Sequence, residues 1–105
     1  MTMGKQGLYN RREDGCWLCG NPYVECHHVY GGVGRRPISD REGCFIFLCR
    51  EHHQGSTGVH QDKRFRDWLR RDCQRRWEER EGLHGQEAHD EFRRLFGASY
   101  AWEEQ

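Results

Sequence analysis

The chain has 105 residues, close to the commonest size of a single domain. Its 17 basic and 17 acidic residues give a formal net charge of zero, and only 34% of its residues are hydrophobic. No stretch approaches the roughly 20 apolar positions that a membrane-spanning helix needs, which excludes such a helix. Six Cys and seven His are many for this length, and a domain with so small a core usually needs disulfides or a metal to fold.

The redox compartment decides between disulfides and a metal. Residues 1–15 are polar and charged, lack the apolar segment of a secretory signal, and are predicted to form a flexible N-terminal arm. The chain also starts with Met1, so we expect a cytoplasmic protein with reduced thiols. Clustered Cys and His then indicate metal ligation, with a disulfide framework as the alternative.

Residues 16–105 are predicted to form a single domain. Apolar and glycine patterns predict, in chain order, a turn with a Cys pair at 15–22, an extended segment at 23–30, a polar loop at 35–42, a buried strand at 43–49, a short helical turn at 50–53, a helix at 62–81 and a helix at 86–96. In the longer helix, apolar residues share one face at helical spacing: Phe65, Trp68, Leu69, Cys73 and Trp77. Asp62 is its expected N-cap, and Gly97 is expected to end the last helix.

Two short pairs of metal-ligand residues frame the first half of the domain. Cys16 and Cys19 form a C-x-x-C pair in the first turn, and Cys49 and His52 form a C-x-x-H pair after the buried strand. Two such pairs supply the four ligands of a tetrahedral zinc site. We therefore expect a structural zinc that adds the folding free energy this small core lacks. Either cysteine between the two pairs could replace one ligand.

A second group of histidines brackets the predicted strands: His27, His28, His53 and His60. The order of strand, loop, strand and helix, with a His pair on the first strand and a His after a C-x-x-H pair, resembles the HNH endonuclease family. The resemblance is carried by CHHVYGG (Cys26–Gly32), LCREHH (Leu48–His53) and GVH (Gly58–His60). The chain is also similar to a small phage-associated branch of that family, through the ending EFRRLFGASY (Glu91–Tyr100).

The resemblance implies an α+β domain with a ββα-metal (HNH or His-Me finger) core at about residues 23–81, a zinc knuckle and C-terminal helices. It implies that His28 is the general base and that His27 and His53 bind one catalytic divalent metal. His60 would complete that metal site or contact the scissile phosphate. The implied activity is hydrolysis of DNA phosphodiester bonds, one strand per event, in a bacterial or phage-encoded protein.

One position departs from the family pattern. The middle Asn of the HNH motif, which braces the base, has no counterpart here. By spacing, Cys44 stands in its place, and a thiol cannot make the hydrogen bonds of an amide. Either Asp40 or Glu42 is near enough in sequence to brace His28, or the backbone alone orients it.

The expected ligands and basic residues define the cofactor and the partner. A catalytic site built from imidazoles favours Mn²⁺ or Ni²⁺ over Mg²⁺, which prefers oxygen ligands. Fifteen of the 17 basic residues are Arg, whose planar fork matches a phosphate group. We expect a monomer that binds duplex DNA with weak sequence preference, leaving RNA and a dimer open. The expected phosphate contacts are Arg35, Arg36, Lys63, Arg66 and Arg70.

Two other interpretations stay open. The missing Asn favours a non-catalytic, zinc-stabilised module that binds nucleic acid. The acidic residues after position 82 would suit a structural zinc domain held by protein partners in a phage or packaging complex. The four histidines that occur together favour the enzyme.

Overall fold

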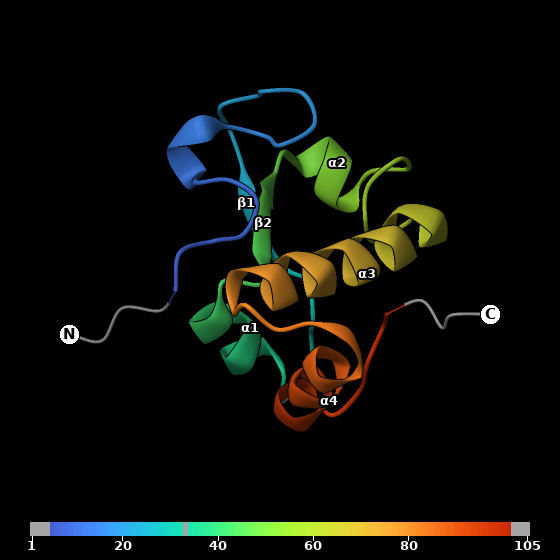
Figure 1. Cartoon of the computed structure of the whole chain (residues 1–105). Helices are drawn as coiled ribbons and strands as arrows, with labels where there is room; N and C mark the ends of the chain where they lie inside the picture. The colour runs from blue at the N-terminus through green and yellow to red at the C-terminus, as the bar shows by residue number, and fades with distance from the viewer. Residues whose placement is uncertain (1–4, 33, 102–105) are drawn as a thin grey trace.

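The computed structural model describes residues 5–32 and 34–101, which form an α+β fold (Figure 1). The elements in this part of the chain are the 3-10 turn η1 (Arg12–Asp14), β1 (Glu25–His28), α1 (Arg36–Glu42), β2 (Phe45–Leu48), α2 (Arg50–Gln54), α3 (Lys63–Arg80) and α4 (Gly85–Phe96). The helices α1 and α2 lie at opposite ends of the two strands. None of the helices in the described residues is long and apolar enough to cross a membrane.

The two strands pair antiparallel, with Glu25 opposite Leu48 and His28 opposite Phe45. Ile46 and Leu48 are fully buried, so the predicted buried strand is confirmed in its centre, although pairing is limited to four residues on each strand. The register sets the geometry of the site, because it puts the start of β1 beside α2 and the end of β1 beside α1.

Helix α1 corrects the sequence prediction, which expected a polar loop over residues 35–42. The helix begins with a Pro in its first turn and ends at Gly43, whose φ of 82° is the left-handed conformation that glycine adopts most easily. Its inward residues are polar: the Ser39 hydroxyl donates to the Tyr30 carbonyl at 2.8 Å, and the Glu42 carboxylate accepts from Trp77 Nε1 at 3.0 Å. Ile38 is the hydrophobic residue of this helix that packs against the core, so the segment shows no apolar period from which the helix could be predicted.

Helix α3 forms the long side of the core. Asp62 caps it as predicted, since its carboxylate accepts from the backbone N–H groups of Arg64 and Phe65. Leu69, Cys73 and Trp77 are buried as expected, but Trp68 is 40% exposed. The Trp68 ring stacks on Trp17 of the first turn, with 6.1 Å between ring centroids, at the border of the core.

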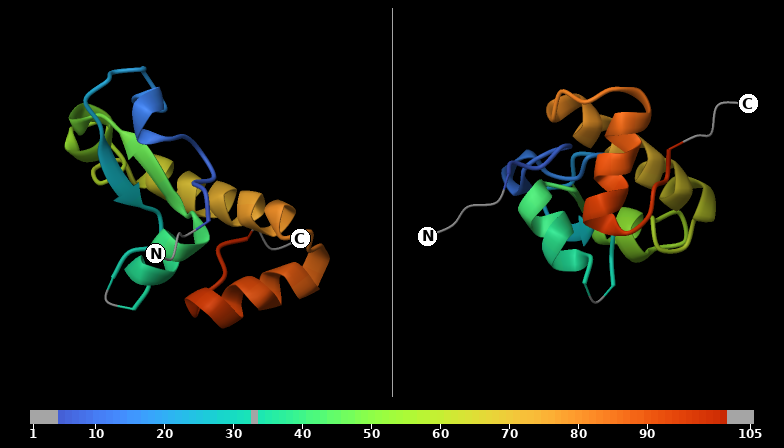
Figure 2. Two further views of the ribbon diagram at one scale, coloured as in Figure 1. Left: turned by 90° about the vertical axis from the view of Figure 1, so that its left-hand side faces the viewer. Right: turned by 60° about the horizontal axis from the view of Figure 1, so that its bottom comes forward.

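Helix α4 lies alongside the C-terminal half of α3 (Figure 2). Ala88, Phe92 and Phe96 are buried, and the rings of Phe92 and Phe96 lie 5.1 and 4.9 Å from the ring of Tyr30, which follows β1. Gly97 ends the helix in the left-handed conformation, as predicted. The C-terminal helix therefore covers the end of the sheet that carries His28.

The segment that the sequence predicted as a flexible arm packs against the domain over the part that the structure describes. The Asn10 side chain bridges the first turn and β2: its amide donates to the carbonyls of Gly15 and Phe47, and its oxygen accepts from the Phe47 N–H. Lys5 Nζ lies 2.7 Å from the Glu42 carboxylate. Leu8 and Tyr9 also pack against the core. The sequence pattern missed this attachment because its contacts are isolated along the segment and form no apolar period.

Candidate metal centres and the adjoining pocket

Four sulfur and nitrogen ligands converge where the first turn meets α2. Cys16 and Cys19 come from the turn after η1, Cys49 caps α2, and His52 lies in the first turn of α2. Three of the separations between their ligand atoms are 3.3, 3.6 and 3.8 Å, and all four atoms lie within 4.8 Å of one another. Corners of a tetrahedron with metal–ligand bonds of about 2.0–2.3 Å lie about 3.3–3.8 Å apart. This Cys3His cluster could therefore hold a metal such as zinc.

The surroundings of Cys16 favour the thiolate form that a metal needs. Burial alone would raise the pKa of the Cys16 thiol, but hydrogen bonds from backbone N–H groups of both ligand turns, together with the His52 ring, lower that pKa to about 6. The other two cysteines before residue 50 lie outside the cluster. Cys26 is half-buried on β1, and Cys44 is fully buried at the start of β2.

Three histidines form a second cluster beside the first. His27 comes from β1, His53 from α2 and His60 from the loop after α2. Their ring centroids lie 4.7–5.2 Å apart, and the Nε2 atoms of His53 and His60 are 3.0 Å apart. One nitrogen from each ring belongs to a group whose atoms all lie within 4.8 Å of one another. These residues could hold a metal ion.

A tight loop brings His60 back to α2. The Val59 N–H donates to the His52 carbonyl and the His60 N–H donates to the His53 carbonyl, at 2.8 and 3.1 Å. A side chain at Gly58 would come within 2.9 Å of backbone atoms of α2. The close return therefore requires glycine, and it bridges the seven-residue gap between the two histidines.

Two of the three rings in the second cluster, those of His27 and His60, are neutral at physiological pH. Burial, followed by the neighbouring imidazoles and Arg70, lowers the pKa of His27 to about 3. Burial, followed by His53 and Arg66, also lowers the pKa of His60. Both rings therefore keep a free nitrogen lone pair near pH 7, which is the form that binds a transition metal.

His28 lies next to this cluster at the α1 end of the sheet. Its Nε2 atom is 3.3 Å from a carboxylate oxygen of Asp40, which projects from α1. The other sequence candidate for this contact, Glu42, instead binds Lys5 and Trp77 in the interior. Of the two carboxylates that the sequence left open, the structure brings Asp40 to His28. Cys44 packs its thiol in the core.

A pocket of about 330 Å³ opens over the histidines. Its walls include the four histidines of the second group that the sequence singled out, together with three arginines: His27, His28, His53, His60, Arg36, Arg66 and Arg70. Two of the basic residues expected to contact a phosphate lie elsewhere. Arg35 donates to the Tyr100 hydroxyl at 3.0 Å, and Lys63 pairs with Asp67 one helical turn later.

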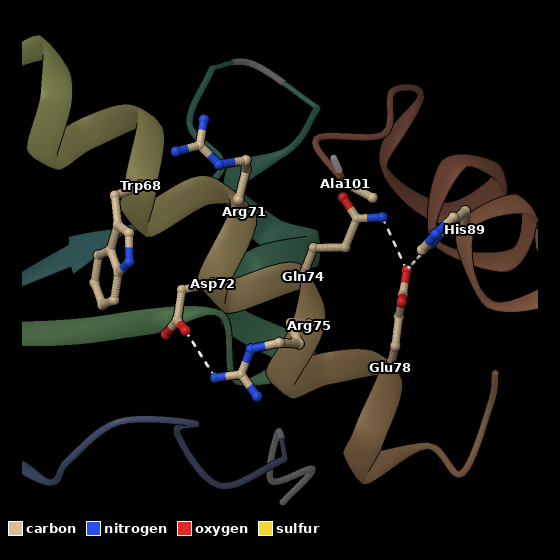
Figure 3. A pocket seen from close by; sticks show the side chains of 8 residues that line it. All are labelled: Trp68, Arg71, Asp72, Gln74, Arg75, Glu78, His89 and Ala101. Carbon is tan, nitrogen blue, oxygen red and sulfur yellow. Dashed lines mark hydrogen bonds and ion pairs between the residues drawn. The ribbon is translucent and has the colours of Figure 1, made fainter. Parts of the chain in front are cut away.

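A second hollow, of about 300 Å³, lies between α3 and the C-terminal segment (Figure 3). Its polar side chains bind one another: Arg75 pairs with Asp72, and Glu78 accepts from both Gln74 and His89. His89 of α4 thus ties that helix to α3. These contacts attach the last helix to α3.

Comparisons with models of protein families, with curated proteins and with solved structures found no match to this chain. Evidence for a function therefore comes from the geometry of the two clusters.

One further contact, between Glu25 and His53, was not predicted from the sequence; the atoms Oε1 and Nδ1 lie 2.8 Å apart. The available signal was the two-residue period of a strand, which puts Glu25 and His27 on the same face of β1.

Proposed function

We propose that this protein is a metal-dependent endonuclease of the HNH type that hydrolyses DNA phosphodiester bonds. One observation carries the proposal: a single pocket joins three mutually close imidazoles, a fourth histidine with its own carboxylate, and three arginine side chains. Hydrolysis of a phosphodiester needs a base for water, positive charge at the phosphate and a stabilised leaving oxygen. The pocket offers residues for each requirement.

The three-histidine cluster fits a divalent metal by its donor chemistry. Its donors are imidazole nitrogens, and the lowered pKa values of His27 and His60 leave one nitrogen of each of these two rings unprotonated. Such a set suits Mn²⁺ or Ni²⁺ better than Mg²⁺. When bound by these residues, a divalent metal would stabilise the negative charge that develops on the phosphate and on the leaving oxygen.

His28 supports the proposal as the general base. An ionised carboxylate only accepts hydrogen bonds, so Asp40 accepts from the Nε2–H of His28 and leaves Nδ1 with the lone pair. Nδ1 takes a proton from the attacking water as its oxygen bonds to phosphorus and the bond to the 3′ oxygen breaks. Asp40 thereby takes the bracing role of the missing Asn. General-base help of this kind accelerates reactions by roughly 10²–10⁴-fold.

The arginines suit a nucleic acid as substrate. Arg36, Arg66 and Arg70 line the pocket on two sides, from α1 and from α3. Their guanidinium groups can bind phosphates that flank the scissile bond without reading bases. The proposed substrate is therefore duplex DNA with weak sequence preference, cut in one strand per event.

A supercoiled-plasmid assay tests this proposal. The wild type is compared with His28→Ala in Mn²⁺, Ni²⁺, Mg²⁺ and EDTA, and His84→Ala, at an exposed position before α4, serves as the matched control. We expect open circles from the wild type and the control with Mn²⁺ or Ni²⁺. The His28→Ala variant should be slower by about 10²–10⁴-fold while it stays folded, because only the base is removed.

A second candidate function rests on the buried Cys44 at the position of the family's Asn, which favours a module that binds nucleic acid without cutting it. If the folded, zinc-loaded wild type cuts nothing with any metal, or if His28→Ala cuts equally fast, the catalytic role is wrong and this second candidate replaces it. Highest activity with Mg²⁺ would contradict the assignment of three imidazole ligands.

A further inference from the structure

Glu25 contacts the three-histidine cluster from outside its pocket. Its carboxylate oxygen Oε1 lies 2.8 Å from His53 Nδ1, and Gln54 Nε2 lies 3.0 Å from the same oxygen. The strand register explains the contact, because Glu25 is opposite Leu48, two residues before α2 begins. The pocket lining does not include Glu25, so its carboxylate reaches the cluster only through His53.

This contact determines which nitrogen of His53 is available. An ionised carboxylate accepts hydrogen bonds and cannot donate, so the proton of the neutral ring resides on Nδ1. The lone pair is then on Nε2, the atom that lies 3.0 Å from His60 Nε2 inside the cluster. The amide of Gln54 holds the carboxylate in place by donating to it.

We propose that Glu25 is a positioning residue of the divalent-metal site, which holds His53 in the tautomer and ring orientation that direct Nε2 to the metal. The inference rests on the proposed function for the metal site itself. A carboxylate bonded to the far nitrogen of a ligand imidazole also increases the electron density on the near nitrogen, which strengthens the bond to the metal. Loss of such a partner typically weakens metal binding by about 10–100-fold.

The role of Glu25 can be separated from a role in stability. Its side chain is 36% exposed, and ion pairs at exposed positions contribute little to folding. Removal of the carboxylate should leave the fold intact and change the metal site. Glu51 provides a control with the same charge, because it is an exposed carboxylate on α2, the helix that carries His53.

The experiment titrates Mn²⁺ into the zinc-loaded full chain by calorimetry. We expect Glu25→Ala to bind Mn²⁺ about 10–100-fold more weakly than the wild type. Glu25→Gln should lose less, because its amide oxygen still accepts from Nδ1–H, and Glu51→Gln should bind like the wild type. A long-range ¹H–¹⁵N spectrum of the wild type without Mn²⁺ should show the His53 proton on Nδ1.

Two results would overturn the inference alone: Glu25→Ala that binds Mn²⁺ as tightly as the wild type, or a His53 ring protonated on Nε2. The spectrum decides the question even if a variant fails to fold. The His27→Ala variant distinguishes failure of the inference about Glu25 from failure of the proposed metal site. If the wild type binds Mn²⁺ and His27→Ala does not, the metal site stands whatever Glu25 does. If the wild type binds no Mn²⁺ at a site that depends on His27, the proposed function and the inference fail together.

Discussion

Helix α2 gives neighbouring residues to two clusters of opposite character. His52 joins three cysteines, with its Nδ1 atom 3.3 Å from Cys49 Sγ, and His53 joins two histidines, with its Nε2 atom 3.0 Å from His60. Successive residues on a helix point about 100° apart, so one helical turn serves both clusters. The cysteine cluster offers four protein ligands, which leaves no open position. The histidine cluster offers three and borders a pocket.

This difference in ligand number suggests different roles for the two clusters, one in stability and one in binding. A closed, sulfur-rich site is typical of a structural metal, whereas three ligands with an open position are typical of a catalytic one. The clusters share α2 and the sheet, so a metal in the closed site would also hold His53 and His27 in place. Three predictions test this comparison, from the largest expected effect to the smallest.

Replacement of Cys49 by Ser should break the closed cluster and with it the fold. Structural zinc contributes about 10–16 kcal/mol in small zinc domains, comparable to the whole stability of about 5–15 kcal/mol for a typical protein. We expect loss of the cooperative thermal transition by circular dichroism and loss of bound zinc by elemental analysis. Cys26→Ser, at a half-buried position outside the cluster, should keep both. A Cys49→Ser variant that melts at the wild-type temperature would refute the structural role.

The open cluster should make stability depend on pH in the absence of added divalent metal. The pKa of His27 is about 3 in the folded chain and about 6.5 in the unfolded chain. Between these values the unfolded state binds more protons, so stability falls as the pH decreases from about 6.5 towards 3.

Urea unfolding at pH 7 and pH 5 measures this effect. Between pH 6.5 and 5 the contribution of His27 amounts to about 2 kcal/mol. His27→Gln lacks this contribution, so its stability should decrease by about 2 kcal/mol less than that of the wild type over the same interval. The cysteine cluster is common to both proteins, and its own pH dependence cancels in the difference. An equal decrease in both would show that His27 is not held neutral by burial.

The smallest expected effect concerns the arginines that line the histidine pocket. Arg36 lines the histidine pocket from an exposed position, so Arg36→Gln should weaken binding of duplex DNA a few-fold. The slope of log affinity against log salt should also decrease by about 1, because one phosphate contact is lost. Fluorescence anisotropy in the His28→Ala background measures binding without cleavage. Lys63→Gln is the control, since Lys63 pairs with Asp67 away from the pocket; an equal change in both variants would exclude a specific role for Arg36.

Whether a helix, strand or ligand cluster could be predicted depended on the sequence pattern of its residues. The C-x-x-C and C-x-x-H pairs named all four members of the cysteine cluster, because ligands at short fixed spacing belong to one turn. The apolar periods located β2, α3 and α4 to within two residues at each end. Helix α1 was not predicted because its buried residues Ser39 and Glu42 are polar, and their hydrogen-bond partners lie outside the helix, on Tyr30 and Trp77.

The sequence by itself determined an α+β chain with two groups of metal-ligand residues and with the buried strand and the two longer helices, since local spacing and hydrophobic period are properties of short segments. The tertiary structure decided which residues meet. It joined His60 to His53 through a loop that requires Gly58, and it brought Asp40 rather than Glu42 to His28. It also brought Glu25 to His53 through the strand register. Such contacts depend on the strand register and on the path of the loops. They join residues from different segments, and local sequence patterns do not show how those segments pack together.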